Sequence, residues 1–365
     1  MNYTKANHPK KWQVEFDEDI SDYFQPSRWT PEQSLKILNL NSQLNLNLFR
    51  DAMSFHSVSR VKNAAVLTLN RPKALNAINK EMSVGIRNDF KKTIADKPSV
   101  IISKSSFEKA FCAGGDIRAL TDLINEKKFD EVLQASVDEW NLYYTFATSP
   151  IPVVSLMHGI VMGGGAGLCM HSKYRVGTET TTFAMPETAI GFFPDAGASH
   201  FLPRLPQKNL GKCLAVSGMR MKGINCFDTG ITSHFCHSTL LGKLEEDLTH
   251  CKNESDILQV LDDVHKQSLK LQINYDKFKY HDQNPERWNN GGETIYEVLR
   301  EIEEHYSAQN FEDLKEALRA GSKWAVKHLE TVEKMSPTAC MVALETGSRG
   351  SHMDLKQVFQ MEYWM

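Results

Sequence analysis

Two glycine-rich stretches decide how this chain is expected to fold: Phe111-Cys112-Ala113-Gly114-Gly115-Asp116 and His158-Gly159-Ile160-Val161-Met162-Gly163-Gly164-Gly165. Each follows an apolar run, Val100-Ile101-Ile102 in the first case and 152–157 in the second, and each precedes a helical pattern. Glycine allows tight turns and a close approach of the backbone to a ligand. The repeated order of strand, glycine-rich turn and helix predicts an α/β fold.

The pattern of apolar residues predicts further elements around these stretches. Residues 65–69 and 183–185 are expected to be short strands, and 82–94 has the spacing of an amphipathic helix. After about residue 240 helical patterns dominate, at 293–306, 311–320, 323–334 and 337–344, with Gly321 and Gly347 as expected helix ends. We therefore expect three parts: an N-terminal extension over 1–53, with a helix start at Thr30-Pro31, a core over 54–240 and a helical region over 241–365.

Composition narrows the class of protein. The chain has 365 residues, 41% of them hydrophobic, and a formal net charge of -3, so no overall field favours nucleic acid or an anionic membrane. Its seven cysteines include no C-x-x-C pair, which predicts buried free thiols and a reducing compartment. The apolar runs are too short to span a bilayer and the histidines lack metal-ligand spacing, so we expect a soluble intracellular protein without a metal.

The glycine clusters have a chemical interpretation. A carbonyl that becomes tetrahedral during reaction needs hydrogen-bond donors about 2.7–3.1 Å from its oxygen, and two backbone N–H groups can supply them. Gly115 and Gly164 stand where such amides are expected, and the helix after the second cluster adds its positive N-terminal end. The alternative is that both clusters are only tight turns. Neither matches a dinucleotide fingerprint or a phosphate-binding loop.

At this point the chain resembles the crotonase (enoyl-CoA hydratase/isomerase) superfamily, and within it most closely the 3-hydroxyisobutyryl-CoA hydrolases. The resemblance is carried by Thr68-Leu69-Asn70-Arg71-Pro72-Lys73-Ala74-Leu75-Asn76-Ala77, by 109–118, by the second glycine cluster and by 183–195. It implies a crotonase-like ββα spiral core that binds acyl-CoA, followed by a helical C-terminal portion. It also implies a mitochondrial thioester hydrolase of valine catabolism that needs no cofactor, since coenzyme A is part of the substrate. The only partners expected are this acyl-CoA and further copies of the chain.

The resemblance also implies roles for individual residues. Gly115 and Gly164 correspond to the oxyanion-hole amides, and Glu187 and Asp195 to catalytic carboxylates. Glu139, Gly164, Glu187 and Asp195 surround the acyl group. The residues expected to bind coenzyme A, mainly through backbone groups, are Lys73, Ala74, Leu75, Ala113 and Asp116.

Two positions favour hydrolysis over hydration. Hydratases resemble G-G-G-C-E at the second cluster, whereas this chain has Gly167 in place of that second glutamate. Addition of water across a double bond requires two acid/base groups, and one is missing here. Conversely, Asp195 stands where hydratases usually carry glycine. We expect Glu187 either to attack the thioester or to activate water, and Asp195 to handle the proton of the leaving thiolate with help from Glu139.

Each of these residues has a structural alternative. Glu187 could be an acid in the first turn of a helix, Asp195 a helix cap and Glu139 a solvated helical acid. His158 and His171 are expected to be packing residues rather than bases. The Phe192-Phe193 pair is expected in either the pocket wall or the core.

Two departures from the family leave other functions open. The family usually continues beyond the motif resembling Met361-Glu362-Tyr363, so we expect this chain to be truncated or to have lost a tail. The basic residues of 1–11 are followed at once by acids, which is unlike a transit peptide. The alternatives are a non-catalytic assembly protein, such as a mitochondrial ribosome component, and an enoyl-CoA hydratase or isomerase.

Overall fold

The computed structural model describes residues 55–279 and 295–365, with side chains described except over 272–279. The described residues belong to one compact unit. The expected extension over 1–53, including its helix start at Thr30, lies outside the described residues.

Two sheets form the core of the described chain. The larger has six strands in the order β1-β2-β3-β5-β7-β10, in which β1 is antiparallel to β2 and the other neighbours are parallel. The smaller has the order β4-β6-β8-β9, parallel except for the β8–β9 pair. The strands are β1 (His56–Val61), β2 (Ala64–Leu69), β3 (Val100–Ser105), β4 (Ala110–Cys112), β5 (Val153–Met157), β6 (Ile160–Met162), β7 (Tyr174–Gly177), β8 (Thr182–Ala184), β9 (Met221–Lys222) and β10 (His234–Phe235).

The chain winds between these sheets as a spiral. Each turn places one strand in the larger sheet and the next in the smaller, as the pairs β3–β4, β5–β6 and β7–β8 show. The expected α/β class with a ββα spiral is therefore confirmed. One detail was wrong: the glycine turns do not follow the strands over 100–102 and 152–157 directly. The stretches Ala110–Cys112 and Ile160–Met162, taken as parts of the clusters, are themselves strands of the second sheet.

Helices of the spiral begin where capping residues stand. Asn79 accepts a hydrogen bond from the amide of Met82 at 2.9 Å and starts the helix expected over 82–94, and Asp116 caps the helix after the first glycine cluster. These elements are α3 (Lys80–Ala95), α4 (Ile117–Asn125), α5 (Phe129–Ala147), α6 (Gly164–Cys169), α7 (Ala198–Phe201), α8 (Leu210–Ser217) and α9 (Asn225–Asp228), with short turns η4 (Pro72–Ala74), η5 (Glu187–Ile190), η6 (Leu202–Arg204) and η7 (Ser238–Leu240).

Helices also dominate after residue 240, as expected. They are α10 (Leu241–His250), α11 (Glu254–Lys279), α12 (Ile295–His305), α13 (Phe311–Ala320), α14 (Lys323–Val332), α15 (Pro337–Gly350) and α16 (Leu355–Trp364). Gly321 ends α13 as predicted, but Gly347 does not end α15, which continues to Gly350. Gly347 does not adopt the left-handed conformation with which glycine usually ends a helix, so α15 continues through it.

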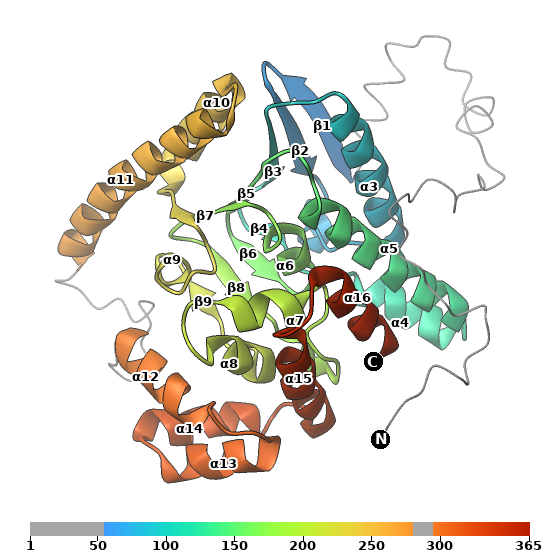
Figure 1. The fold of residues 1–365 in the computed structure, drawn as a ribbon, viewed down its shortest axis with the longest axis vertical. Coiled ribbons are helices and arrows are strands. Elements are labelled where there is room, and N and C mark those ends of the chain that lie inside the picture. The colour runs from blue at the N-terminus through green and yellow to red at the C-terminus, as the bar shows by residue number, and fades with distance from the viewer. Residues whose placement is uncertain (1–54, 280–294) are drawn as a thin grey trace. The chain divides into compact units, whose positions relative to one another are not determined.

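The C-terminal helices pack on the spiral in two groups. Leu244, Leu248 and Leu261 of α10 and α11 join the buried cluster of the larger sheet, together with Val66 and Val100. The last helix, α16, contacts α5, which carries Glu139, and α7, which follows Asp195 (Figure 1).

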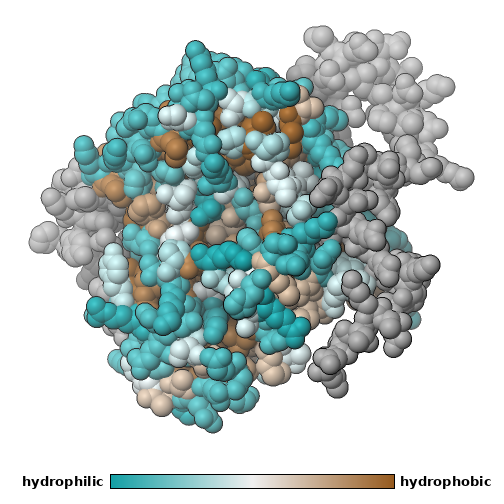
Figure 2. Space-filling model, in the orientation of Figure 1, coloured by the Kyte–Doolittle hydropathy of each residue, from teal (hydrophilic) through white to brown (hydrophobic). Residues whose placement is uncertain are grey.

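The surface and the cysteines agree with the analysis of composition. All seven cysteines are buried free thiols. None of the helices over the described ranges combines the length and apolarity needed to cross a membrane. On the face seen in Figure 2, hydrophobic residues lie in separate patches among hydrophilic ones.

Candidate active site

Three of the expected site residues, Gly115, Gly164 and Glu187, follow three neighbouring strands. In the smaller sheet β4, β6 and β8 are adjacent and parallel. Gly114 and Gly115 follow β4, Gly163 and Gly164 follow β6, and Glu187 follows β8. Because the carboxyl ends of parallel strands meet at one edge of a sheet, all these groups converge there.

The two expected oxyanion amides lie side by side. A Cβ built on Gly164 would lie 3.2 Å from the amide nitrogen of Gly115 and would collide with the hydroxyl of Tyr143. Within the described chain, neither amide donates a hydrogen bond to another backbone group. Gly114 has a φ of 119°, which other residues rarely adopt, and this conformation turns the chain between β4 and Gly115. Two adjacent unused donors suit an anionic oxygen.

Glu187 follows the third strand and lies beside the second glycine turn, at Gly163. It begins η5 and is 8% exposed. Its Oε1 lies 2.8 Å from the position of a Cβ on Gly163, and its buried Oε2 has no hydrogen-bond partner. Burial and then the charge of Asp195 hold the pKa of Glu187 well above its usual range. Glu187 does stand in the first turn of a short helix, as the structural alternative expected. Its unpartnered oxygen also leaves the carboxyl group available for chemistry.

Asp195 lies in the loop before α7. Its Oδ2 accepts a 2.9 Å hydrogen bond from Nε1 of Trp140 on α5. The residue that caps α7 is Gly197, without a side-chain hydrogen bond, so the capping alternative for Asp195 is wrong. Burial raises the pKa of Asp195 to about 6, although the bond from Trp140 lowers it. A carboxyl group with this pKa exchanges protons near neutral pH.

Glu139 points from α5 toward the first amide. Its Oε2 accepts a 2.9 Å hydrogen bond from the hydroxyl of Tyr143, one helical turn later, and lies 3.2 Å from the position of a Cβ on Gly115. Burial, followed by the charge of Asp195, raises the pKa of Glu139 to about 8. The alternative of a solvated helical acid is therefore wrong.

Tyr143 was not identified from the sequence, yet it explains the glycine at position 167. A Cβ on Gly167 would lie 3.0 Å from two ring carbons of Tyr143 and 2.8 Å from the Cβ of Ala196. These contacts leave no room for a glutamate there. The spacing of Glu139 and Tyr143, four residues apart on one helix, was the available signal.

The expected coenzyme A residues lie beside the first glycine turn. The amide of Ala113 donates to the carbonyl of Leu75 at 3.0 Å. Lys73 is exposed, while Ala74 and Leu75 are half-buried, in and just after η4. The buried Asn76 fixes this turn to β4 by donating from Nδ2 to the carbonyl of Phe111 at 2.9 Å.

Asp116 has two structural partners. Its Oδ1 accepts from the amide of Ala119 at 3.1 Å, and its Oδ2 pairs with Nη2 of Arg71 at 2.6 Å. Despite partial burial, these contacts hold the pKa of Asp116 below its usual value. Asp116 thus joins the 71–77 turn to the glycine loop, and a ligand contact with its side chain stays a prediction. Arg71 also donates to the carbonyl of Ala77 at 2.7 Å, so it is more than a surface charge.

The histidines and phenylalanines have packing positions. His158 Nδ1 lies 2.9 Å from the hydroxyl of Thr178. His171 Nε2 lies 3.1 Å from the carbonyl of Ala196, and burial lowers its pKa to about 4. Both facts agree with the expectation that these histidines are not bases. Phe193 is buried, whereas Phe192 is 44% exposed and packs on it at 4.7 Å.

A fourth acid near the cluster was also missed. Glu362 of α16 is buried, and its carboxylate accepts from the amides of Gly197 at 2.8 Å and Ser199 at 3.0 Å. Burial, followed by the charge of Asp195, raises the pKa of Glu362 to about 8. Nothing in the local sequence indicates that this helix reaches a loop 165 positions earlier.

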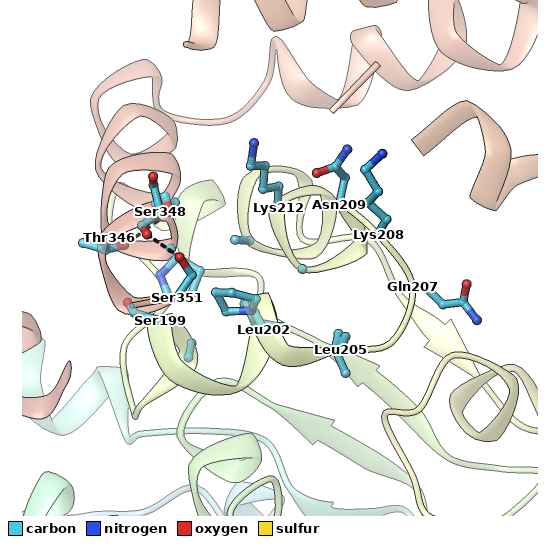
Figure 3. Close-up of a pocket in the computed structure, with 17 residues that line it drawn as sticks. Ser199, Leu202, Leu205, Gln207, Lys208, Asn209, Lys212, Thr346, Ser348 and Ser351 are labelled. Atoms are coloured by element: carbon cyan, nitrogen blue, oxygen red, sulfur yellow. Dashed lines mark hydrogen bonds between the residues drawn. The ribbon is translucent and has the colours of Figure 1, made fainter. Parts of the chain in front are cut away.

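A cavity of about 280 Å³ lies behind the Asp195 loop, between η6, α8 and α15 (Figure 3). Its lining includes Pro194, Ser199, Leu202, Lys212 and Ser348 but no carboxylate. The cavity is therefore separate from the acidic cluster, although the same loop forms part of its wall.

Comparisons with known proteins agree with this geometry. The chain is 40% identical to the mitochondrial 3-hydroxyisobutyryl-CoA hydrolase of Danio rerio over 83% of its own length and 76% of the relative's. It is also 40% identical to the Homo sapiens protein of the same name, over 82% and 73%. Among solved structures, a carnitinyl-CoA dehydratase from Mycobacterium thermoresistibile is 27% identical with a TM-score of 0.71, covering 85% of this chain and 84% of that one.

The same fold occurs in an enoyl-CoA hydratase from Rhodobacter sphaeroides, which is 27% identical with a TM-score of 0.68 over 85% of this chain and 83% of that one. The crotonase-like fold is thereby confirmed. The model of the family described as "Enoyl-CoA hydratase/isomerase" matches residues 64–365, which include both glycine turns, the acids Glu139, Glu187, Asp195 and Glu362, and α16. With the paired amides and the spiral that presents them, this match shows that the chain belongs to the enoyl-CoA hydratase/isomerase family.

Proposed function

We propose that the protein hydrolyses a short 3-hydroxyacyl-CoA thioester, 3-hydroxyisobutyryl-CoA, to 3-hydroxyisobutyrate and coenzyme A, a step of valine catabolism. The observation that carries the proposal is the buried, unpartnered carboxylate oxygen of Glu187 beside two unused amides. The names of the relatives support this substrate.

The amides of Gly115 and Gly164 bind the thioester oxygen and stabilise the negative charge that develops on it. Glu187 then acts by one of two routes. It attacks the carbonyl carbon and forms a mixed anhydride, which water later hydrolyses, or it removes a proton from the water that attacks. In both routes the C–S bond breaks when the tetrahedral oxyanion collapses.

Asp195 supplies the proton that the departing thiolate takes up, and a proton from the attacking water restores it. Asp195 also binds the 3-hydroxyl group of the acyl chain, and Glu139 on α5 assists it. The pKa of about 6 for Asp195 lets it donate and regain a proton near neutral pH. Overall, one thioester and one water give one acid and one thiol.

The coenzyme A part of the substrate lies along the turn at Lys73, Ala74 and Leu75 and against Ala113. These residues offer backbone groups next to the glycine loop, and the exposed ammonium of Lys73 suits a phosphate. No separate cofactor is needed, because coenzyme A arrives with the acyl group. The names of the relatives also support a mitochondrial location, which imaging of a fluorescent fusion would test.

Hydration is the second candidate, because two solved structures of the same fold are titled a hydratase and a dehydratase. Both activities are measured on the purified chain: thiol release from 3-hydroxyisobutyryl-CoA and hydration of crotonyl-CoA. We expect thiol release that Glu187→Gln lowers by about a hundredfold or more and that Glu345→Gln, an exposed carboxylate on α15, leaves unchanged.

Hydration without thiol release would overturn the proposal, and neither activity would favour an assembly protein. Full thioesterase activity in Glu187→Gln would remove Glu187 from the mechanism. A single turnover in heavy-oxygen water tests the anhydride route. Label in the Glu187 carboxylate would show an anhydride that water attacks at the glutamyl carbon, whereas label in the product alone is the result of general-base catalysis or of attack on the anhydride at its acyl carbon.

A further inference from the structure

Two consecutive residues of α16 contact Trp140 and the loop that carries Asp195, and Trp140 and Asp195 are themselves joined by a hydrogen bond. The Glu362 carboxylate accepts from the amides of Gly197 and Ser199, which follow Asp195 in the same loop. The Tyr363 ring meets the Trp140 indole edge-on, with centroids 5.7 Å apart and an interplanar angle of 81°. One turn of α16 therefore contacts the donor residue of this bond and the backbone of the loop that carries its acceptor.

The remainder of α16 supports this arrangement. Phe359 packs edge-on against Tyr144 of α5, with centroids 6.0 Å apart, and against His171 at 5.8 Å. His171 in turn contacts the carbonyl of Ala196. The helix α16 thus packs against α5 through two aromatic contacts and is hydrogen-bonded to the loop of Asp195.

The loop has space to move on its other side. Pro194, Ala198 and Ser199 line the cavity of about 280 Å³. Ala196 has a φ of 59°, which alanine rarely adopts, so the loop needs outside support to keep this conformation. The carboxylate of Glu362 supplies two hydrogen bonds from the side of α16.

We propose that Glu362 and Tyr363 are positioning residues that hold the Asp195 carboxylate against the Trp140 indole and so set its place in the active site. The inference rests on the proposed role of Asp195 in thioester hydrolysis.

A carboxyl group at position 362 suits this task better than a side-chain amide. Its two oxygens accept one hydrogen bond each from two amides, whereas the amide of a glutamine has only one oxygen to accept. The acidic groups that face Glu362 are Asp195 and Glu187. An apolar residue at position 362 would leave two buried N–H groups unpaired, and that costs stability.

The test compares Glu362→Gln and Tyr363→Leu with two controls, Tyr363→Phe and Glu345→Gln. The phenylalanine keeps the ring that faces Trp140, and Glu345 is an exposed carboxylate of the neighbouring helix. Each variant is checked for folding by thermal unfolding. The kinetic readout is kcat and KM for thiol release, and the structural readout is the indole N–H resonance of Trp140, assigned with Trp140→Phe.

We expect Glu362→Gln and Tyr363→Leu to lower kcat about tenfold to a hundredfold, with a smaller change in KM, because a displaced catalytic group costs rate more than binding. The Trp140 resonance should shift toward the position of an indole without a hydrogen bond. Tyr363→Phe and Glu345→Gln should each leave both kcat and the Trp140 resonance at their wild-type values.

Wild-type kcat and an unshifted Trp140 resonance in both test variants would overturn the inference. If Glu362→Gln yields little folded protein, Tyr363→Leu tests the same arrangement with Glu362 in place. A wild-type protein that releases no thiol would instead contradict the proposed function, and the Trp140 resonance would still decide whether α16 holds Asp195.

Discussion

Trp140 on α5 and Asp195 in the loop before α7 are joined by a 2.9 Å hydrogen bond between residues 55 positions apart. The indole N–H favours the ionised form of a carboxylate, so it offsets part of the effect of burial on the pKa of Asp195. The pKa of Asp195 is about 6, against about 8 for Glu139 and Glu362.

Replacing Trp140 by phenylalanine should therefore change the pH dependence of catalysis. Loss of the hydrogen bond favours the protonated carboxyl, so the pKa of Asp195 rises above about 6. We expect the transition near pH 6 in the profile of kcat/KM to move to higher pH. The measurement is thiol release between pH 5 and 9, and an unmoved transition would show that another group controls it.

Replacing Tyr143 by phenylalanine removes the donor to Glu139. Since this bond lowers the pKa of Glu139, its loss should raise that pKa further. We expect the free energy of unfolding to fall by about 1 kcal/mol, the usual net value of such a bond. Urea unfolding at pH 8 measures the change, with Tyr296→Phe, an exposed tyrosine, as the control. Equal losses in both variants would contradict the prediction.

Alanine at position 167 should destabilise the protein. Its Cβ would lie 2.8 Å from the Cβ of Ala196 and 3.0 Å from the ring of Tyr143, and such overpacking costs about 1–3 kcal/mol. Gly347→Ala is the matched control, because a Cβ there meets open space inside α15. We expect this control to be neutral or stabilising by up to about 1 kcal/mol. If Gly167→Ala has the free energy of unfolding of the wild type, the loop that contains Ala196 moves to make room for the methyl group, and the prediction is wrong.

The raised pKa of Glu139 should make the protein less stable as the pH rises. The pKa of Glu139 is about 8 in the folded chain against 4.5 for the free side chain, so the folded state binds its proton more tightly. The stability from this proton is present at low pH and is lost as the pH rises from about 4.5 through 8. Glu139→Gln, which has no such proton, should be more stable relative to wild type at pH 9 than at pH 5.

Urea midpoints at the two pH values test this difference, and Glu345→Gln serves as an exposed control. If the gap between Glu139→Gln and wild type is the same at both pH values, Glu139 does not contribute to the pH dependence.

The α/β class and the two glycine turns could be predicted because both depend on local patterns of residues. The strands Ala110–Cys112 and Ile160–Met162 were missed because most of their residues were assigned to the glycine turns that follow them. Glu187 and Asp195 were found through the family resemblance, which also carried their roles.

Tyr143 and Glu362 were missed for different physical reasons. Tyr143 lies among apolar residues on a helix, where an aromatic residue ordinarily indicates core packing. Glu362 acts on amides far away in the chain, and only the folded structure brings α16 to that loop.

The arrangement of the smaller sheet has a consequence for how such sites can vary. Gly115, Gly164 and Glu187 follow three adjacent strands, which lie about 4.8 Å apart because backbone hydrogen bonds join them. The spacing of the backbone where these strands end is therefore set by main-chain geometry that every residue type shares, and the glutamate side chain reaches from there toward the amides. Loops that select the acyl chain can lengthen or change sequence around this constant distance, so new substrates can be acquired without rebuilding the reacting centre.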